Sequence, residues 1–246
     1  MLDGAYHRSH AREARGAIVQ AHGISADMDE GGMFIRLADQ LAAQGFDVLR
    51  FSFRGHGRSG GTQIGLTIAG EMLDLQAAIA ILTDRSMAPV SIIAASFGAA
   101  STCLLLPYLH EQLHALVLWN PTLDLRRTFI EPELPWGKRN FNPDAVQRLT
   151  SDGFLLLEGE YQIGRALYVE LTAFDPLQRF IASPVRTAIV HGDRDTYVPY
   201  DVSARAAQQH RHCELITIEG ADHGFDPDKE DDAITPTVAW IDRVYA

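Results

Sequence analysis

The chain has 246 residues, of which 46% are hydrophobic and 22% charged, and this apolar fraction excludes a disordered chain because it suffices to bury a large core. The formal net charge is −11 and no block of basic residues is present, which argues against a nucleic-acid-binding protein, since phosphate binding needs Lys and Arg gathered on one face. The two cysteines are too few for a disulfide framework, so we expect both to be reduced, buried thiols.

Through most of the chain, a short apolar run is followed by a turn and then by a segment of helical periodicity. The predicted strands comprise residues 17–21, 47–53, 90–95, 115–119, 185–190 and 214–218. The predicted helices comprise residues 34–41, 67–83 and 97–106, the third ended by Pro107, and a last helix that begins at Thr235 with Pro236 in its first position. This alternation predicts an α/β fold, a mostly parallel central sheet flanked by helices on both faces, which binds ligands at the carboxyl ends of its strands.

Between residues 123 and 183 the alternation stops, and aromatic residues and prolines become frequent. Residues 154–158 and 161–163 predict a small hairpin around Gly159, and residues 166–173 predict a helix. We interpret the segment 123–183 as a cap inserted over the ligand end of the sheet, with residues 1–122 and 184–246 forming the core. A peripheral decoration is the alternative.

The third predicted strand ends in a pattern that is typical of a nucleophile. Ala94-Ala95-Ser96-Phe97-Gly98 reads small-x-Ser-x-Gly, the nucleophile elbow, in which small flanking residues allow a tight strand–turn–helix to present the serine. A serine between small residues can also be structural, so Ser96 needs partners to support this interpretation.

A serine hydroxyl becomes a nucleophile beside a base, and the base needs an acid that orients it. Asp195 follows the strand at 185–190, with Asp193 as its rival two residues earlier, and His223 follows the strand at 214–218. The chain order Ser, Asp, His is the order found in hydrolases with a nucleophile elbow. We therefore predict Ser96 as nucleophile, His223 as base and Asp195 as orienting acid, although each could separately be a structural or loop residue.

An oxyanion hole is predicted from two backbone N–H groups, those of Ile24 and Phe97. They follow the His-Gly turn after the first strand and the nucleophile, respectively, which is where such donors are needed. His22 and His56 are interpreted as parts of their loops rather than as catalytic bases.

The chain resembles the α/β-hydrolases over most of its length. The motifs that carry the resemblance are, in family order, His22-Gly23, Arg54-Gly55-His56-Gly57-x-Ser59, the elbow at Ser96, His191-Gly192-x-x-Asp195 and Glu219-Gly220-Ala221-Asp222-His223. It is most similar to the feruloyl/cinnamoyl-esterase and monoacylglycerol-lipase-like branch, often described as serine-aminopeptidase-like hydrolases, whose small cap follows the sixth strand. The resemblance implies a serine hydrolase that uses Ser96, Asp195 and His223.

Three departures from this branch are visible. Ala94 stands where glycine is commoner, and Ser52 stands where relatives often have Asp. Few residues precede Ala17, which predicts that the outermost of the usual eight strands is missing.

The predicted reaction is hydrolysis of a carboxylic ester with an apolar or aryl acyl group, through an acyl-enzyme on Ser96. No cofactor and no metal are expected, because metal-ligand spacings and phosphate-binding glycine loops are absent. Peptidase or amidase and thioesterase activities remain alternatives within the fold, and a non-catalytic receptor or scaffold is the alternative of another class. Acidic cap residues that could bind a free amino terminus are Glu131, Glu133, Glu158 and Glu160. The candidate pocket walls, each of which could instead belong to the core, are Trp119, Trp136, Phe154 and Tyr161.

The acidic run from Asp226 to Asp232 comes soon after His223, and it predicts either a solvated loop or a pocket rim that disfavours anionic substrates. No apolar run approaches the roughly 18 residues that span a bilayer, and no secretory signal is visible, so we expect a cytoplasmic protein without a membrane span. The expected partner is a small-molecule ester rather than nucleic acid, and a homodimer is left open.

Overall fold

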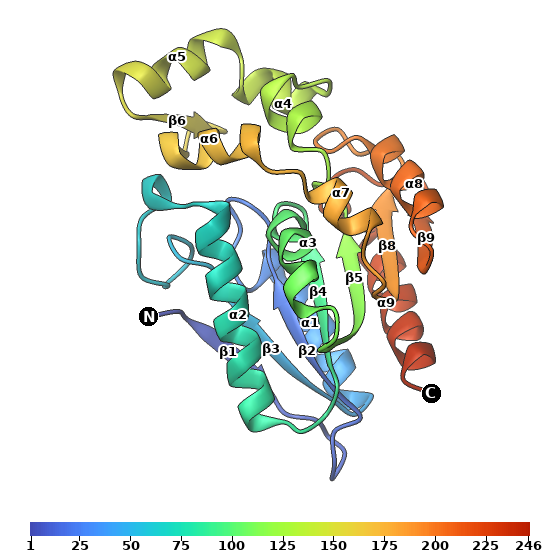
Figure 1. Ribbon diagram of the computed structural model, residues 1–246. Coiled ribbons are helices and arrows are strands. Elements are labelled where there is room, and N and C mark those ends of the chain that lie inside the picture. The colour runs from blue at the N-terminus through green and yellow to red at the C-terminus, as the bar shows by residue number, and fades with distance from the viewer.

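The computed structural model describes residues 1–246, and its centre is a seven-stranded sheet in the order β1-β3-β2-β4-β5-β8-β9 (Figure 1). Only the edge strand β1 is antiparallel to its neighbour. The strands are β1 Gly4–His7, β2 Gly16–Ala21, β3 Phe46–Phe51, β4 Val90–Ala95, β5 Leu113–Trp119, β8 Thr187–Gly192 and β9 Cys213–Ile218. The predicted α/β fold with a mostly parallel sheet is confirmed. The sheet has one strand fewer than the eight that are usual in the family that the sequence resembles.

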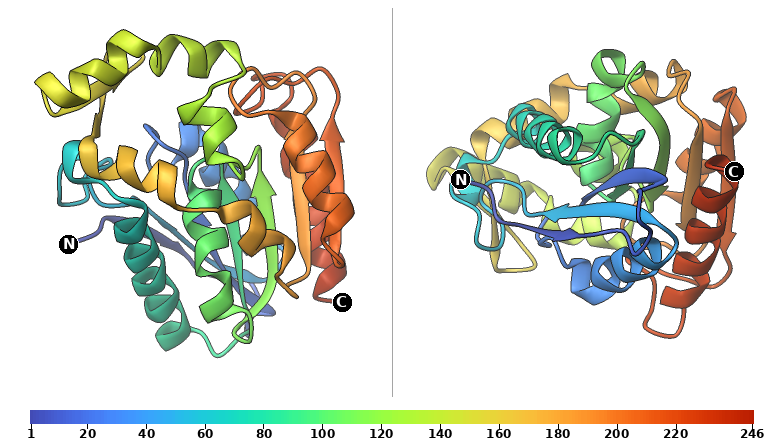
Figure 2. Two further views of the ribbon diagram at one scale, coloured as in Figure 1. Left: turned by 45° about the horizontal axis from the view of Figure 1, so that its top comes forward. Right: turned by 90° about the horizontal axis from the view of Figure 1, so that it is seen from below.

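Helices cover both faces of the sheet (Figure 2). On one face, α2 Ile68–Arg85, α3 Gly98–Leu109, α7 Pro176–Ile181 and α8 Tyr200–Gln209 contribute to the larger core cluster. On the other face, α1 Met33–Ala43 and α9 Glu230–Val244 contribute to a second cluster. Strand β2 shows why both faces need a cover. Its successive residues Ile18 and Val19 point to opposite faces of the sheet, Val19 into the first cluster and Ile18 into the second, and both are apolar and fully buried.

Two prolines lie inside helices that they were expected to end or begin. The expected end at Pro107 is wrong, since α3 continues to Leu109, whose burial against the core offsets the one backbone hydrogen bond that proline removes. The expected start at Thr235, with Pro236 in the first helical position, is also wrong, because α9 begins at Glu230. The backbone carbonyl that Pro236 leaves without a helical partner belongs to the exposed Asp232 and can be hydrated.

The acidic run before α9 is therefore not a loop throughout. Glu230, Asp231 and Asp232 form the first turn of α9, where negative charge is favoured by the positive end of the helix dipole. Glu230 also pairs with Arg36 of α1. This pairing directs Glu230 toward α1.

The segment between β5 and β8 lies over the carboxyl ends of the strands (Figure 1). It contains a π-helical turn Arg126–Ile130, α4 Pro135–Asn140, α5 Pro143–Ser151, the hairpin β6 Phe154–Leu157 and β7 Tyr161–Gly164, and α6 Arg165–Ala173. The predicted hairpin and the helix after it are thus present. The last element before β8, α7, packs back on α3, and its Phe180 belongs to the larger core cluster.

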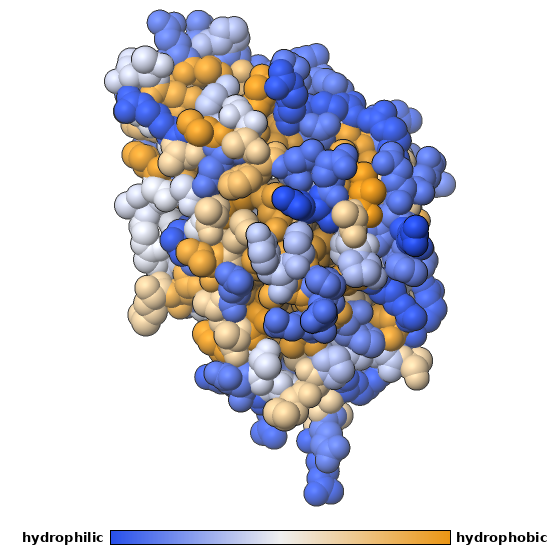
Figure 3. Space-filling view, in the orientation of Figure 1, coloured by the Kyte–Doolittle hydropathy of each residue, from blue (hydrophilic) through white to orange (hydrophobic).

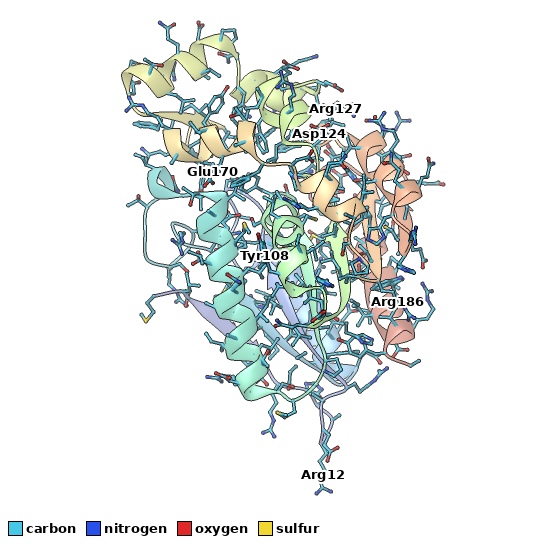
Figure 4. The ribbon with its side chains drawn as sticks, in the orientation of Figure 1. Arg12, Tyr108, Asp124, Arg127, Glu170 and Arg186 are labelled. Atoms are coloured by element: carbon cyan, nitrogen blue, oxygen red, sulfur yellow. The ribbon has the colours of Figure 1, made fainter.

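The hairpin side of this segment is attached to the loop after β3 and to the start of α2. The Tyr161 hydroxyl lies 2.7 Å from His56 Nε2, and the Gln162 N–H donates to Gln63 Oε1 at 3.0 Å. Glu170 of α6, labelled in Figure 4, accepts from the N–H groups of Ile68 and Ala69. The carboxylate thereby satisfies orphan donors at the positive end of α2.

The other side of the segment is attached to the loop after β8 and to α8. Arg127, also labelled in Figure 4, donates to Asp201 of α8 at 3.0 Å and to Glu133 at 2.7 Å. The Trp136 N–H donates to the Thr196 carbonyl at 3.3 Å. The segment is therefore held to the sheet on both sides.

The surface differs between the two sides of the view in Figure 3, with apolar side chains more frequent over α2 and α6 and hydrophilic ones over α8 and β9. Large apolar residues that are exposed on α2 and α6 include Leu73, Ile81 and Val169. None of the helices combines the length and the apolar character needed to cross a membrane.

Candidate active site

Three strand ends bring the predicted Ser, Asp and His side chains together. Ser96 follows β4, Asp195 follows β8 and His223 follows β9. His223 Nε2 lies 2.9 Å from Ser96 Oγ, and His223 Nδ1 lies 2.8 Å from Asp195 Oδ2. The rival Asp193 is directed elsewhere, since its Oδ1 accepts the Gly220 N–H at 2.7 Å.

The turn at Ser96 is tight because its neighbours are small. Ser96 has φ 47°, the left-handed region that few residues other than glycine adopt. A Cβ at Gly98 would lie 2.4 Å from the His22 carbonyl oxygen, and one at Gly23 would lie 3.0 Å from Ser96 Cβ. The two glycines thus allow the elbow and the loop after β2 to approach each other closely.

Replacing Gly98 with alanine is expected to lower the free energy of unfolding by at least about 2 kcal/mol, because the new methyl group meets backbone rather than a flexible side chain. Thermal or urea unfolding measures this. Gly60→Ala is the matched control, since its Cβ would have ordinary contacts at 3.4 Å, and its expected change stays within about 0.5 kcal/mol. Equal stability of both variants would contradict the close approach at Gly98.

The carboxylate of Asp195 is hydrogen-bonded to protein groups at both of its oxygens. Its side chain is buried, and Oδ1 accepts the N–H groups of Tyr197 and Val198, each at 2.8 Å. Oδ2 lies 3.0 Å from His191 Nε2 in addition to its contact with His223. Burial alone would raise the pKa of Asp195, but the charge of His223 and the hydrogen bonds from both histidines hold this pKa well below its usual range.

His191 opens the motif that ends at Asp195, but the sequence predicted no role for its side chain. It is fully buried, and its Nδ1 lies 2.8 Å from Ser203 Oγ. When Ser203 donates to Nδ1, Nε2 carries the proton and donates to Asp195. The signal in the sequence was its spacing, since His191 stands four residues before Asp195.

The charge state of His223 follows from the acidic groups around it. Burial lowers the pKa of His223, yet the charges of Asp195, Glu30 and Asp222 and the Asp195 hydrogen bond outweigh burial, so that this pKa lies above its ordinary value. A base of this kind is neutral, and able to accept a proton, only above the raised pKa.

The two predicted oxyanion donors belong to Phe97, which follows Ser96 in the chain, and to Ile24, which lines the same cavity as Ser96. Neither the Ile24 nor the Phe97 amide donates to another group of the protein. Next to Ile24, the Gly23 N–H donates to Glu30 Oε2 at 2.9 Å, which fixes the start of this loop. Both amides are therefore free to donate to a ligand atom beside Ser96 Oγ.

A cavity of about 230 Å³ opens between Ser96 and the inserted segment, and His223 lies in its wall. Ile24, Phe129 and Tyr197 provide much of its apolar lining. A larger hollow of about 640 Å³ lies between the loop after β1 and the turn after α2, but it contains no member of the Ser–His–Asp set. The small cavity is the one suited to a reacting substrate.

Among the four aromatic residues expected as pocket walls, Trp136 alone lines this cavity. Trp119 lies in the core beneath α1 and α9, and its indole N–H donates to Thr237 Oγ1 at 2.9 Å. Phe154 begins the hairpin, and Tyr161 is buried against His56. The structure thus separates these three from the Ser96 cavity.

Two carboxyl groups line the cavity, Glu30 near Ser96 and Glu158 from the hairpin turn. Burial raises the pKa of Glu30, and this effect outweighs the hydrogen bond from the Gly23 N–H, which lowers it, so that the pKa is about 7. Sequence reasoning missed Glu30, while it named Glu158 as a possible amine ligand. Glu131 and Glu133 are paired with Arg126 and Arg127 and do not reach the cavity.

Comparison with solved structures shows the same fold in distant proteins. Est1E from Butyrivibrio proteoclasticus, solved with ferulic acid bound, is 19% identical, with a TM-score of 0.80 over 98% of this chain and 93% of that one. The monoacylglycerol lipase of Paleococcus ferrophilus is 18% identical, with a TM-score of 0.72 over 99% of both chains. A thermophilic esterase from Thermogutta terrifontis is 16% identical, with a TM-score of 0.70 over 100% of this chain and 95% of the other.

The sequence itself was compared with curated proteins and with protein families. No curated protein matches it. Residues 12–230 match the family described as serine aminopeptidase, S33. With the sheet order and the strand-end geometry above, this match shows that the chain belongs to the serine aminopeptidase (S33) family of α/β-hydrolases.

Proposed function

We propose that this hydrolase cleaves small carboxylic esters with an apolar or aryl acyl group, with Ser96 as nucleophile, His223 as general base and acid, and Asp195 as orienting acid. The observation that carries the proposal is the unbroken set of contacts from Ser96 Oγ through the His223 ring to Asp195, at 2.9 and 2.8 Å, beside a cavity. Residues 123–183 would serve as the cap that closes this cavity.

In the proposed reaction, His223 Nε2 takes the Ser96 proton while Oγ attacks the ester carbonyl carbon. The carbonyl oxygen becomes an oxyanion that the Ile24 and Phe97 amides stabilise, and His223 then protonates the departing alcohol. A water activated by His223 hydrolyses the acyl-enzyme by the same route. Proton transfer contributes about 10²–10⁴-fold and each oxyanion donor about 10²–10³-fold.

The cavity limits the substrate by size and by charge. A volume of about 230 Å³ holds an aryl or short acyl group but not a long chain. Aromatic walls favour apolar groups, whereas Glu30 and Glu158 disfavour carboxylates. The ferulic acid bound to Est1E supports an aryl acyl group, and the neighbours described as a monoacylglycerol lipase and as an esterase support an ester substrate.

A panel of esters tests this proposal. We expect p-nitrophenyl acetate, p-nitrophenyl butyrate and methyl ferulate to have higher kcat/KM than p-nitrophenyl palmitate by at least about tenfold, since the long chain exceeds the cavity. Faster turnover of palmitate, or of a carboxylate-bearing ester than of its neutral analogue at low salt, would contradict the proposed cavity specificity.

The second candidate is a peptidase or amidase, and it is favoured by the two carboxyl groups in the cavity, which could bind an ammonium group. An aminoacyl anilide added to the panel separates the two. Preferential cleavage of the anilide would replace the esterase proposal. Thioesters would react by the same steps, while the cytoplasmic location and homodimer formation stay predictions from the sequence.

A further inference from the structure

Three aromatic rings form a stack that begins at His223 and ends in the inserted segment. The Tyr197 ring lies 4.7 Å from the His223 ring, centroid to centroid, at an interplanar angle of 8°. Tyr197 also stacks with the Trp136 ring, at 5.0 Å between centroids and an interplanar angle of 16°. The three rings are thus close to parallel, and Tyr197 is the ring that contacts both the imidazole and the indole.

Backbone hydrogen bonds fix the stack where it meets the core. The Tyr197 N–H donates to Asp195 Oδ1 at 2.8 Å, and the Trp136 N–H donates to the Thr196 carbonyl at 3.3 Å. The backbone that carries Tyr197 is therefore tied both to the orienting acid and to α4.

The outer end of the stack is fixed by packing. Trp136 is 5% exposed, and its ring centroid lies 6.0 Å from that of Phe129 and 5.9 Å from that of Phe141, within the core of the inserted segment. Trp136 cannot withdraw from Tyr197 without opening this core. Movement of α4 would therefore be transmitted to Tyr197.

We propose that Tyr197 and Trp136 are positioning residues that hold the His223 ring in line between Asp195 and Ser96, so that the seating of α4 sets the orientation of the base. The inference rests on the proposed function, because it assigns His223 the role of base. Two hydrogen bonds leave an imidazole free to tilt about the line that joins them, and a parallel ring at 4.7 Å removes this freedom. The Tyr197 face also stabilises the imidazolium that forms when His223 takes the proton.

The charged groups that face His223 are all acidic. Asp195 approaches from the loop after β8, Glu30 from the loop after β2, and Asp222 precedes His223 in its own loop. None of them is removed when Tyr197 or Trp136 is substituted. A change in the pH profile of such variants therefore reports the stack rather than a lost charge.

The test compares variants of the full chain for kcat, KM and the pH profile of kcat/KM on p-nitrophenyl butyrate. For Tyr197→Leu we expect kcat to fall roughly tenfold. The acid limb, which in the unaltered protein lies above pH 6.5 because the pKa of His223 is raised, should move down by about half a unit. Trp136→Leu should change kcat and the acid limb in the same direction but by less. Tyr197→Phe keeps an aromatic ring at this position and should therefore keep the acid limb of the unaltered protein. Tyr168→Leu is the matched control, since it removes a ring that packs on the same core of the inserted segment but does not stack on Trp136, Tyr197 or His223.

If Tyr197→Leu and Trp136→Leu change KM alone and keep the kcat and the acid limb of the unaltered protein, the proposal is overturned. Both residues would then be cavity walls only. Equal shifts in Tyr168→Leu would also overturn it, because general loosening of the inserted segment would then suffice. If Tyr197→Leu does not fold, Trp136→Leu decides by the same criteria. Failure of the unaltered protein to react with a fluorophosphonate would instead contradict the proposed function itself.

Discussion

Replacing Ser96 with alanine is expected to abolish covalent labelling by a fluorophosphonate probe and to lower kcat for p-nitrophenyl butyrate by at least about 10⁴-fold. The reason is that Ser96 Oγ is the oxygen 2.9 Å from His223 Nε2, and alanine removes that atom. Loss of a nucleophile leaves only the oxyanion donors and substrate binding to act on the ester, which accounts for the small residual rate.

Ser151→Ala provides the matched control for Ser96→Ala, since Ser151 is an exposed residue at the end of α5. This variant should label and turn over as the unaltered protein does. Labelling that persists in Ser96→Ala, or that disappears in Ser151→Ala, would contradict the assignment of Ser96. Mass spectrometry of the labelled peptide identifies the modified residue directly.

Changing Asp195 to asparagine should lower kcat by about 10⁴-fold while leaving KM nearly unchanged. The surrounding donors dictate the orientation of the new amide. The N–H groups of Tyr197 and Val198 require an acceptor at the Oδ1 position, whereas His191 can change tautomer, donating from Nδ1 to Ser203 Oγ and accepting at Nε2. The amide NH₂ therefore takes the Oδ2 position and faces His223 Nδ1. His223 must then accept there and carry its proton on Nε2, where it cannot take a proton from Ser96.

Asp193→Asn separates this explanation from a general effect of charge. Both variants lose one negative charge from the same loop, but the asparagine at 193 keeps an acceptor for the Gly220 N–H. Turnover should therefore stay close to that of the unaltered protein. A larger loss in Asp193→Asn than in Asp195→Asn would show that the wrong carboxylate was assigned.

How far the sequence predicts this fold depends on the type of signal. Strands such as β4 and β9 were located within a residue because their apolar runs are bounded by turns. The edge strand β1 was missed, because its four residues are only partly buried and have no apolar run. Pro107 and Pro236 misled because local propensity predicts a helix boundary, whereas tertiary packing and helix-terminal charge decided where these helices end and begin.

In the candidate site, too, some residues could be predicted from the sequence and others could not. Spacing along the chain indicated Ser96, Asp195 and His223, and the structure brings them within hydrogen-bonding distance. It could not indicate the side of the sheet to which Trp119 points, because strands buried on both faces lack a polar side. Glu30 was missed because a carboxylate in a loop has the appearance of a solvated residue until the loop folds back on Gly23.

The carboxyl group of Glu30 has a consequence for how each turnover would end. Ester hydrolysis converts a neutral substrate into a carboxylate anion, and in the proposed reaction this anion is released between Glu30 and Glu158. The cavity that admits the ester therefore repels its own product, most strongly above the pKa of Glu30, about 7, where that group is ionised. Departure of the acid is thereby favoured electrostatically, and accumulated product competes weakly with fresh substrate.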